Sequence, residues 1–347
     1  MTDVQMVLVG DTYVQRPDPE SAFRAVLPFT KAADIAFCNL ETVIADKSYI
    51  SPHDRDPRPR TDEEILRYYL DAGFNVMNLA NNPSMYHGVD PFLRCLDLLD
   101  EAGVVHGGGG RNLEEARRPA LIERNGTRVA FVCRASVCAV DAPATADRGG
   151  IARFRVATAY EARPRIHEVP GSPPLIHTIP NAEDRASLEQ DISVAREQAD
   201  VVVVSWHWGI SPATGGAGEL VGYQTEMGRF AIDVGADLVV GHHPHVLQPI
   251  EVYKGKAILY CIGNYVHDLG SFGRRALMAM LVRCLIRDGK IQRLSFVPGM
   301  IDGHGPPAFL RPADRSDVVQ HMANISAPFG TQFEVGEEDV SVVLASS

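Results

Sequence analysis

Five short apolar runs in this sequence each end in a carboxylate, an amide or an imidazole. The polar residues that follow these predicted strands are Asp11, Glu41, Asn82, His207 and the pair His243 and His245. α/β proteins place ligands at the carboxyl ends of strands, so the repetition indicates one site built from several strand ends. Oxygen and imidazole donors without a thiolate suit manganese, iron, zinc or magnesium. We therefore predict that these residues bind one or two divalent metal ions.

The strongest single motif is Gly241-His-His-Pro-His245, which directly follows an apolar run. Imidazoles at the end of a buried strand are costly to leave without partners, and histidine is a common ligand of such ions. His243 and His245 lie two residues apart, so an extended backbone places both on the same side. The alternative is a solvated histidine cluster. For His207 the alternative is a core histidine with satisfied hydrogen bonds.

Strand candidates alternate with helical patterns along the chain, which is typical of an α/β core covered by helices. The strand candidates are 5–9, 35–38, 75–79, 129–133, 201–205, 238–240 and 257–261, and the helical patterns are 61–73, 91–102, 183–198 and 224–234. Thr61-Asp-Glu-Glu64 predicts a capping box for the first helix. Asp288-Gly289 predicts the turn of an antiparallel hairpin at a sheet edge. Loops are predicted at 49–60, 141–150 and 164–180.

Composition limits the classes of partner. The net charge of −11 disfavours binding to nucleic acid or to an anionic membrane. The sequence shows neither a signal-peptide pattern at its start nor an apolar run of membrane-spanning length. We therefore predict a cytoplasmic protein that acts on a peptide or small molecule, with the oligomeric state left open. The six cysteines are irregularly spaced, which favours buried free thiols over disulfides.

The segments GDT, NLET, LANNP, VVSWHWG, GADLVVGHHPH and IGNY resemble the capsule-A type of poly-gamma-glutamate synthesis proteins, relatives of the calcineurin-like metallophosphatases. The resemblance runs from about Val7 to His267. It implies a four-layer αββα sandwich of two mixed sheets, with a catalytic domain over 1–300 and a C-terminal extension over 301–347 on or near the site. It also implies roles: Tyr13 and Asn81 would orient the metal ligands Asp11, Glu41, Asn82, His207, His243 and His245.

The chain departs from the family pattern at three positions. Tyr13 stands where the first motif usually has a second, histidine ligand, and Tyr86 stands where an aspartate is usual. Pro83 replaces the histidine that is thought to protonate the leaving group in the phosphatases, and proline cannot transfer a proton. The replacement acid or base candidates are His87, His242 and His304. For His87 and His304 an ordinary surface histidine is the alternative.

Three functions fit these residues. The first is a metal-dependent epimerase that inverts an α-carbon in a ribosomal peptide precursor of the lasso type, because a lasso-peptide epimerase has a similar scaffold and needs no leaving-group acid. The second is a metal-dependent hydrolase of a phosphoester or amide bond. The third is a non-catalytic metal-binding protein that aids polymer synthesis. These residues place the epimerase slightly ahead of the hydrolase.

Overall fold

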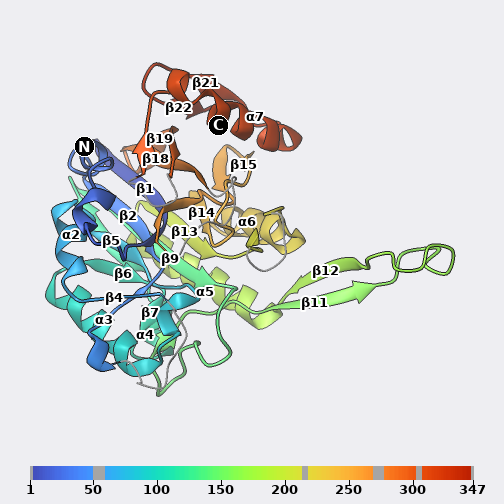
Figure 1. The fold of residues 1–347 in the computed structure, drawn as a ribbon, viewed down its shortest axis with the longest axis horizontal. Helices are drawn as coiled ribbons and strands as arrows, with labels where there is room; N and C mark the ends of the chain where they lie inside the picture. The colour runs from blue at the N-terminus through green and yellow to red at the C-terminus, as the bar shows by residue number, and fades with distance from the viewer. Residues whose placement is uncertain (1–2, 50–58, 213–217, 269–276, 302–306, 345–347) are drawn as a thin grey trace.

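Two large β-sheets pack face to face at the centre of the molecule (Figure 1). The computed structural model describes residues 3–49, 59–212, 218–268, 277–301 and 307–344. The larger sheet has ten strands, in the order β21 (Phe333–Val335), β22 (Val340–Val342), β19 (Lys290–Met300), β18 (Met278–Arg287), β1 (Val4–Tyr13), β2 (Ile35–Leu40), β5 (Val76–Asn78) and β6 (Val105–Gly107), with β17 (Asn264–His267) beside β1 and β20 (Ala308–Phe309) beside β19. The other has six, in the order β15 (Ile250–Tyr253), β16 (Lys256–Leu259), β14 (Leu238–His242), β13 (Val201–His207), β9 (Thr127–Ala135) and β8 (Ala120–Arg124).

Both sheets mix parallel and antiparallel pairs. In the ten-stranded sheet β1, β2, β5 and β6 run parallel, whereas β18 and β19 pair antiparallel. In the six-stranded sheet β9, β13, β14 and β16 run parallel, and β8 and β15 are antiparallel to their neighbours. The parallel strands bring their carboxyl ends to one edge of each sheet, which is the arrangement that the predicted site requires.

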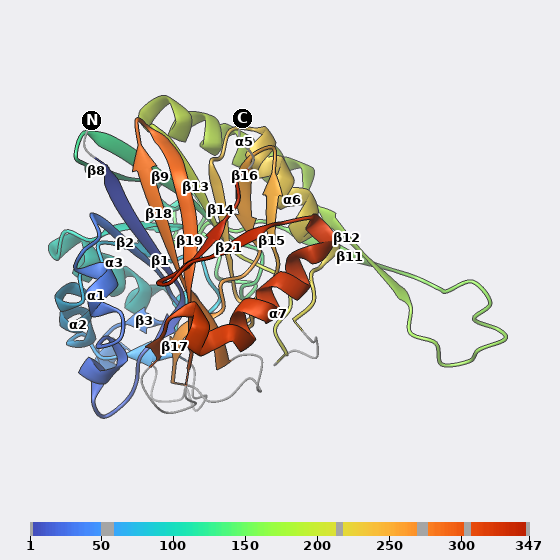
Figure 2. The same cartoon turned by 90° about the horizontal axis from the view of Figure 1, so that it is seen from above.

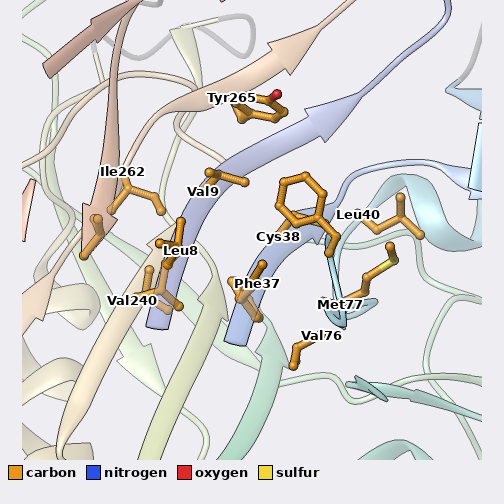
Figure 3. Close-up of a cluster of buried hydrophobic side chains, with 14 of the residues drawn as sticks. Leu8, Val9, Phe37, Cys38, Leu40, Val76, Met77, Val240, Ile262 and Tyr265 are labelled. Atoms are coloured by element: carbon orange, nitrogen blue, oxygen red, sulfur yellow. The ribbon is translucent and has the colours of Figure 1, made fainter. Parts of the chain in front are cut away.

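Side chains alternate between two cores along the six-stranded sheet. In β13, Val201 and Val203 belong to the core between the sheets, whereas Val202 and Val204 belong to a second core under helices. Phe37 of β2 stacks on Phe131 of β9 with 5.1 Å between ring centroids, so these rings join the two sheets. Figure 3 shows Leu8, Phe37 and Val240 among the labelled side chains of the central core.

Helices cover the outer face of each sheet and complete four layers (Figure 2). α2 (Ile65–Asp71) and α3 (Val89–Glu101) lie against the ten-stranded sheet, and α5 (Ala182–Gln198) and α6 (Gly222–Asp233) lie against the six-stranded sheet. The described part of the chain also contains α1 (Leu27–Thr30), α4 (Leu113–Arg117), α7 (Ser316–Ser326) and the 3-10 turns η1 (Pro19–Ala22), η2 (Lys47–Tyr49), η3 (Pro83–Met85), η6 (Pro312–Arg315) and η7 (Ala327–Phe329). The predicted α/β sandwich of two mixed sheets is confirmed.

Among the described residues, three two-stranded ribbons lie outside the main sheets: β3 (Val43–Ile44) with β4 (Arg60–Thr61), β7 (Gly109–Gly110) with β10 (Gly150–Ile151), and β11 (Val156–Glu161) with β12 (Leu175–Pro180). The ribbon of β11 and β12 projects from the body as a long arm (Figures 1 and 2). The prediction of a loop over 164–180 is therefore wrong for its last third. The strand was missed because the segment is rich in proline and because the arm has no buried face, so its sequence shows no alternation of apolar and polar residues. Most of the predicted loop at 49–60 lies outside the described residues.

Two further expectations need correction. Thr61 does not cap α2: it belongs to β4, its Oγ1 lies 3.0 Å from Thr42 Oγ1, and Glu64 is the N-cap residue. The hairpin of β18 and β19 is confirmed, with Asp288 at φ 52° and Gly289 at φ 68° in its turn. It does not form the sheet edge, however, because β22 pairs along the outer side of β19.

The C-terminal residues extend the ten-stranded sheet. β22 pairs with β19, and Ser326 at the end of α7 accepts a hydrogen bond from the Ile250 amide at 3.0 Å. All six cysteines are free, and five of them are buried. Among the described residues, no helix is both long and apolar enough to cross a membrane. The predicted domain boundary at residue 300 and the cytoplasmic location stay predictions.

Candidate metal centre

The six residues predicted as ligands come together where the strands end. Asp11 lies near the end of β1, Glu41 follows β2, and Asn82 lies beyond β5. From the second sheet, His207 ends β13, and His243 and His245 follow β14. All are buried except the half-buried Asn82. Parallel pairing in both sheets puts these ends at one edge, which is why a pattern of strand ends could indicate one site.

Two glycines permit the close approach of the strands that carry these ligands. A Cβ on Gly10 would lie 1.8 Å from the Gly263 carbonyl oxygen, just before β17. A Cβ on Gly241 would lie 1.9 Å from the Tyr260 carbonyl oxygen. Each contact involves backbone, which cannot move aside as a side chain can. Glycine is therefore required directly before Asp11 and His242.

Glu41 lies between two groups of histidines, each with ligand atoms within 4.8 Å of one another. Glu41 Oε2 is 3.5 Å from His267 Nε2, and Oε1 is 3.7 Å from His245 Nε2; we call this group the His267 position. Glu41 Oε1 is also 3.6 Å from His207 Nε2, and His243 completes this second group, the His207 position. One carboxylate thus faces two candidate metal positions and can bridge them.

Asn82 adds an oxygen donor to the His207 position, and Asp11 lies beside His245. Asn82 Oδ1 is 2.6 Å from His207 Nε2, which places the amide oxygen at the His207 position. Asp11 Oδ2 is 3.4 Å from His245 Nδ1, and it accepts a hydrogen bond from the His243 amide at 3.0 Å. Asp11 therefore lies on the Nδ1 side of His245, outside both three-residue groups, and it holds the backbone of His243 from the other sheet.

A buried amide network that the sequence motifs did not reveal holds the Asp11 carboxylate. Asn39 Nδ2 donates to Asp11 Oδ1 at 2.7 Å and lies 3.3 Å from His207 Nδ1. Asn39 Oδ1 in turn accepts from Asn78 Nδ2 at 2.8 Å and from Asn81 Nδ2 at 3.2 Å. Asn81 also donates to the Leu40 carbonyl at 2.8 Å, so its predicted orienting role agrees with its contacts. Asn39 lies in the NLET segment, two residues before Glu41. In a strand this spacing puts both side chains on the same face, so the sequence could have indicated that Asn39 reaches the site.

His267 and Asn264 were also missed, although both belong to the strand β17. Asn264 Oδ1 accepts from His245 Nδ1 at 2.8 Å, which leaves His245 Nε2 free of its proton and able to bind a metal. His267 is buried, and its ring centroid lies 5.0 Å from that of His245. β17 has no long apolar run, so the sequence did not identify it as a strand that reaches the site.

Two of the histidines predicted as ligands have a positive φ, which residues other than glycine rarely adopt. His243 has φ 94° and His245 has φ 57°. Such backbone strain costs on the order of 1–3 kcal/mol for each residue and is concentrated at functional sites. Pro244 separates the two histidines. The prediction of an extended backbone through His243 and His245 is therefore wrong, although both imidazoles reach the centre.

Burial shifts the pKa values of the two carboxyls upward. Loss of solvent raises the pKa of Asp11 to about 7, against the opposing effect of its hydrogen bonds from His243 and Asn39. Burial, with the nearby negative charge of Asp11, raises the pKa of Glu41 well above its usual range. Two buried carboxylates without a cation repel each other, so a bound cation would relieve both effects.

Burial also keeps the histidines of the centre neutral. It lowers the pKa of His243 to about 3 and of His245 to about 4, and it lowers the pKa of His207 and His267 well below 6.5. Neutral imidazole is the form that binds metals. Glu41 Oε2 and His243 Nδ1 have no hydrogen-bond partner within the described part of the chain. The donors therefore fit divalent metal ions of the manganese, iron, zinc or magnesium type.

Comparison with known proteins identifies the family. The model of the family described as bacterial capsule synthesis protein PGA_cap matches residues 3–269. The chain belongs to the PGA_cap family. This confirms the capsule-A-like resemblance that the sequence motifs carried.

Curated relatives of this PGA_cap protein have related names. The capsule biosynthesis protein CapA of Bacillus anthracis is 28% identical over 91% of this chain and 72% of its own length. The PGA biosynthesis protein CapA of Bacillus subtilis is 29% identical over 77% of this chain and 62% of its own length. The chain therefore spans less than two thirds of the latter protein. Neither name describes an epimerase, so these relatives give the epimerase prediction no support.

Two solved structures also align with most of this chain. A hypothetical protein from Thermus thermophilus aligns over 86% of this chain and 100% of its own, with 15% identity and a TM-score of 0.49. The sulfate thiohydrolase SoxB of Thermus thermophilus aligns over 90% of this chain and 47% of its own, with 16% identity and a TM-score of 0.45.

The other predicted residues of this PGA_cap protein lie at different distances from the centre. His242 is fully buried: its Nδ1 is 3.6 Å from Asp11 Oδ1, and its ring centroid is 5.9 Å from that of Phe37. Burial lowers its pKa to about 3, and neither of its ring nitrogens has a hydrogen-bond partner among the described residues. His87 is half-buried between η3 and α3, and His304 lies outside the described residues.

Tyr13 lies next to the centre but does not take part as a metal ligand would. Its ring meets His267 edge-on with 5.5 Å between centroids, and its hydroxyl donates to the Gln15 side chain. Burial raises the pKa of Tyr13 to about 12, so the phenol stays protonated at neutral pH. Its contacts agree with the predicted role of orienting a ligand.

Proposed function

We propose that this PGA_cap protein is a hydrolase that uses two divalent metal ions to cleave a phosphoester or an amide bond. The observation that carries the proposal is Glu41, whose two oxygens face the His267 position and the His207 position. A carboxylate shared by two such groups is the arrangement of two-metal hydrolytic sites. The proposal also agrees with the absence of thiolates from both groups, because hard oxygen donors and imidazole suit hydrolytic metals.

When bound, such ions polarise the scissile group and lower the pKa of a water molecule. The chain supplies their positions. Glu41, Asp11 and Asn82 would provide oxygen donors, and the histidines would provide neutral nitrogen donors. The Asn39 amide holds the Asp11 carboxylate and the Asn81 amide holds the Leu40 backbone, and such supporting contacts set how well the donors are oriented.

The leaving group needs a proton from a residue other than Pro83. Pro83 begins the 3-10 turn η3, directly after Asn82, and carries no transferable proton. His87 follows η3 and is half-buried, so we propose it as the proton donor for the leaving group. A His87→Gln variant should keep its metal and lose hydrolysis most strongly for substrates whose leaving group is a poor one. An equal loss for good and poor leaving groups would contradict this role.

The choice of test substrates follows from the names of the relatives. Their names concern capsule and PGA biosynthesis, so a γ-glutamyl amide is the first amide substrate to test. A model phosphodiester tests the hypothesis that the substrate is a phosphoester. A peptide or another small molecule therefore remains the proposed partner of this chain.

The experiment measures product release from both substrates by the protein loaded with Mn²⁺. We expect release by the wild type, and loss by at least about 100-fold in Glu41→Gln, because this variant removes the charge shared by both positions. Glu123→Gln is the matched control, since Glu123 is exposed on β8. Equal rates in wild type and Glu41→Gln would contradict the proposal.

The epimerase is the second candidate, and Pro83 is the observation that favours it, because epimerisation needs no leaving-group acid. The same incubation in D2O separates the two. Gain of one deuterium at an α-carbon without cleavage would show that the protein is an epimerase and not a hydrolase. Cleavage without deuterium gain at an α-carbon would exclude the epimerase for that peptide.

A further inference from the structure

The strand that carries Asp11 has a neighbour that ends in an imidazole. β1 and β17 pair in parallel, and the register places Tyr13 opposite His267. The Asp268 amide donates to the Tyr13 carbonyl at 3.1 Å, so the pairing continues past both side chains. Close approach of β17 depends on Gly10, where a Cβ would lie 1.8 Å from the Gly263 oxygen. The fold therefore places a second strand end beside the centre.

His267 faces the centre and not the solvent. Its side chain is only 4% exposed, and its Nε2 lies 3.5 Å from Glu41 Oε2. Its ring centroid is 5.0 Å from that of His245 and 5.5 Å from that of Tyr13. One nitrogen of His267, one of His245 and one oxygen of Glu41 lie within 4.8 Å of one another, as the ligands of one ion would. The Tyr13 hydroxyl, by contrast, donates to Gln15.

We infer that His267, on β17, is a metal ligand that completes the His267 position, and that the side chain at position 13 of the paired strand β1 faces the same position. The inference rests on the metal centre of the proposed function. His267 belongs to only one of the two metal positions, whereas Glu41 belongs to both. Loss of His267 should therefore remove one ion and leave the other.

Metal content tests the inference without any substrate. The protein is stripped with a chelator, reloaded with Mn²⁺, and analysed for bound metal and by electron paramagnetic resonance. We expect two ions per wild-type chain, one for each of the two groups, and a spin-coupled signal. His267→Ala should hold one ion and give the signal of isolated Mn²⁺. His177→Ala, which removes an exposed histidine of the arm strand β12, should match the wild type.

A compensating variant tests whether an imidazole at position 13 can replace the imidazole of His267. His267→Phe should hold one ion, and the double variant Tyr13→His with His267→Phe should return to two, because the imidazole then reaches the same position from β1. Circular dichroism and thermal unfolding confirm that each variant is folded. If His267→Ala fails to fold, His267→Gln, which keeps the volume and a polar end, takes its place.

The outcomes separate this inference from the proposed function. Two ions in folded His267→Ala or His267→Gln would overturn the inference and leave the metal centre intact. One ion in the folded double variant would overturn the claim that the side chains at positions 13 and 267 face the same metal position. A wild type that binds no Mn²⁺, Zn²⁺ or Fe²⁺ would instead overturn the metal centre itself, and with it the proposed function.

Discussion

Two histidines of the centre, His243 and His245, have a positive φ, which residues other than glycine rarely adopt. His243 has φ 94°, yet its amide donates to Asp11 and its ring belongs to the His207 position. A glycine would hold this backbone without strain, but it would supply no imidazole. The histidine is therefore explained by function and not by stability.

This conflict gives a prediction for two variants of His243. Both His243→Ala and His243→Gly should lose metal at the His207 position, because both lack the imidazole. His243→Gly should nevertheless be the more stable of the two by about 1 kcal/mol, since alanine keeps the strain of a positive φ and glycine does not. Urea unfolding of the metal-free proteins measures the difference. A less stable glycine variant would show that φ at this residue is not strained.

The buried amide of Asn39 gives a second prediction at this scale. Asn39→Ala removes the donor to Asp11 and the acceptor that the Asn78 and Asn81 side chains share. Stability should fall by about 1–3 kcal/mol, because buried polar groups lose their partners. Affinity for Mn²⁺ should fall by about 10- to 100-fold, as for other residues that support ligands. Titration of the metal-free protein measures it, with exposed Asn324→Ala as the control. Unchanged affinity would contradict the orienting role.

At the scale of elements, the sequence indicated the strands that have apolar runs and missed those that lack them. β1, β2, β9 and β13 are buried along almost their whole length, so their runs are visible in sequence. β17 has only four residues, Asn264–His267, and its place depends on pairing with β1. Pairing between distant segments cannot be read from local pattern. For the same reason His267 escaped detection while the strand-end ligands did not.

The pairing of β1 with β17 gives a prediction at this scale. Gly10→Ala would place a methyl group against the Gly263 carbonyl, so β17 must shift away from β1. We expect a loss of stability of about 1–3 kcal/mol, as in other overpacked sites, together with weaker metal binding at the His267 position. Urea unfolding and metal analysis measure both. Gly222→Ala, where the nearest atom is the Thr178 hydroxyl at 3.3 Å, is the control.

The two effects of Gly10→Ala can be separated in the result. Lower stability with unchanged metal content would show that β17 moves without carrying a ligand. Unchanged stability and unchanged metal content together would show that the strands have room for a methyl group at this point.

At the scale of the whole molecule, the sandwich buries five histidines and two carboxyls of the centre away from solvent. The sequence predicted this architecture because alternating strands and helices, and the family motifs, both indicate it. It did not reveal the arm of β11 and β12, or that residues 307–344 complete the ten-stranded sheet, because neither segment has a distinctive pattern. The burial has a consequence for the whole chain, since it links stability to pH.

The metal-free protein should lose stability as pH falls below about 6.5. The folded pKa values of His242, His243 and His245 are about 3, 3 and 4, against 6.5 when unfolded, so protons bind the unfolded chain first. Each histidine then lowers the free energy of unfolding by about 1.4 kcal/mol per pH unit. Asp11 acts in the opposite sense: its pKa rises from 3.8 to about 7, so its contribution is present at low pH and is lost as pH rises through about 7.

The histidines outnumber the carboxyls, so their effect should prevail between pH 6.5 and pH 4. Urea unfolding in a chelator at a series of pH values measures the slope. His243→Ala should show a smaller slope than the wild type, because it removes one of the contributing groups. A slope that is zero or of opposite sign in the wild type would contradict the burial of neutral histidines.

The central claim is that Glu41 bridges two metal positions, and the most direct measurement is the metal content of the wild type and of Glu41→Gln after loading with Mn²⁺. We predict two ions per wild-type chain with a spin-coupled signal, and strongly reduced binding at both positions in folded Glu41→Gln. A wild type that holds no metal, or a folded Glu41→Gln that still holds two coupled ions, would contradict the claim.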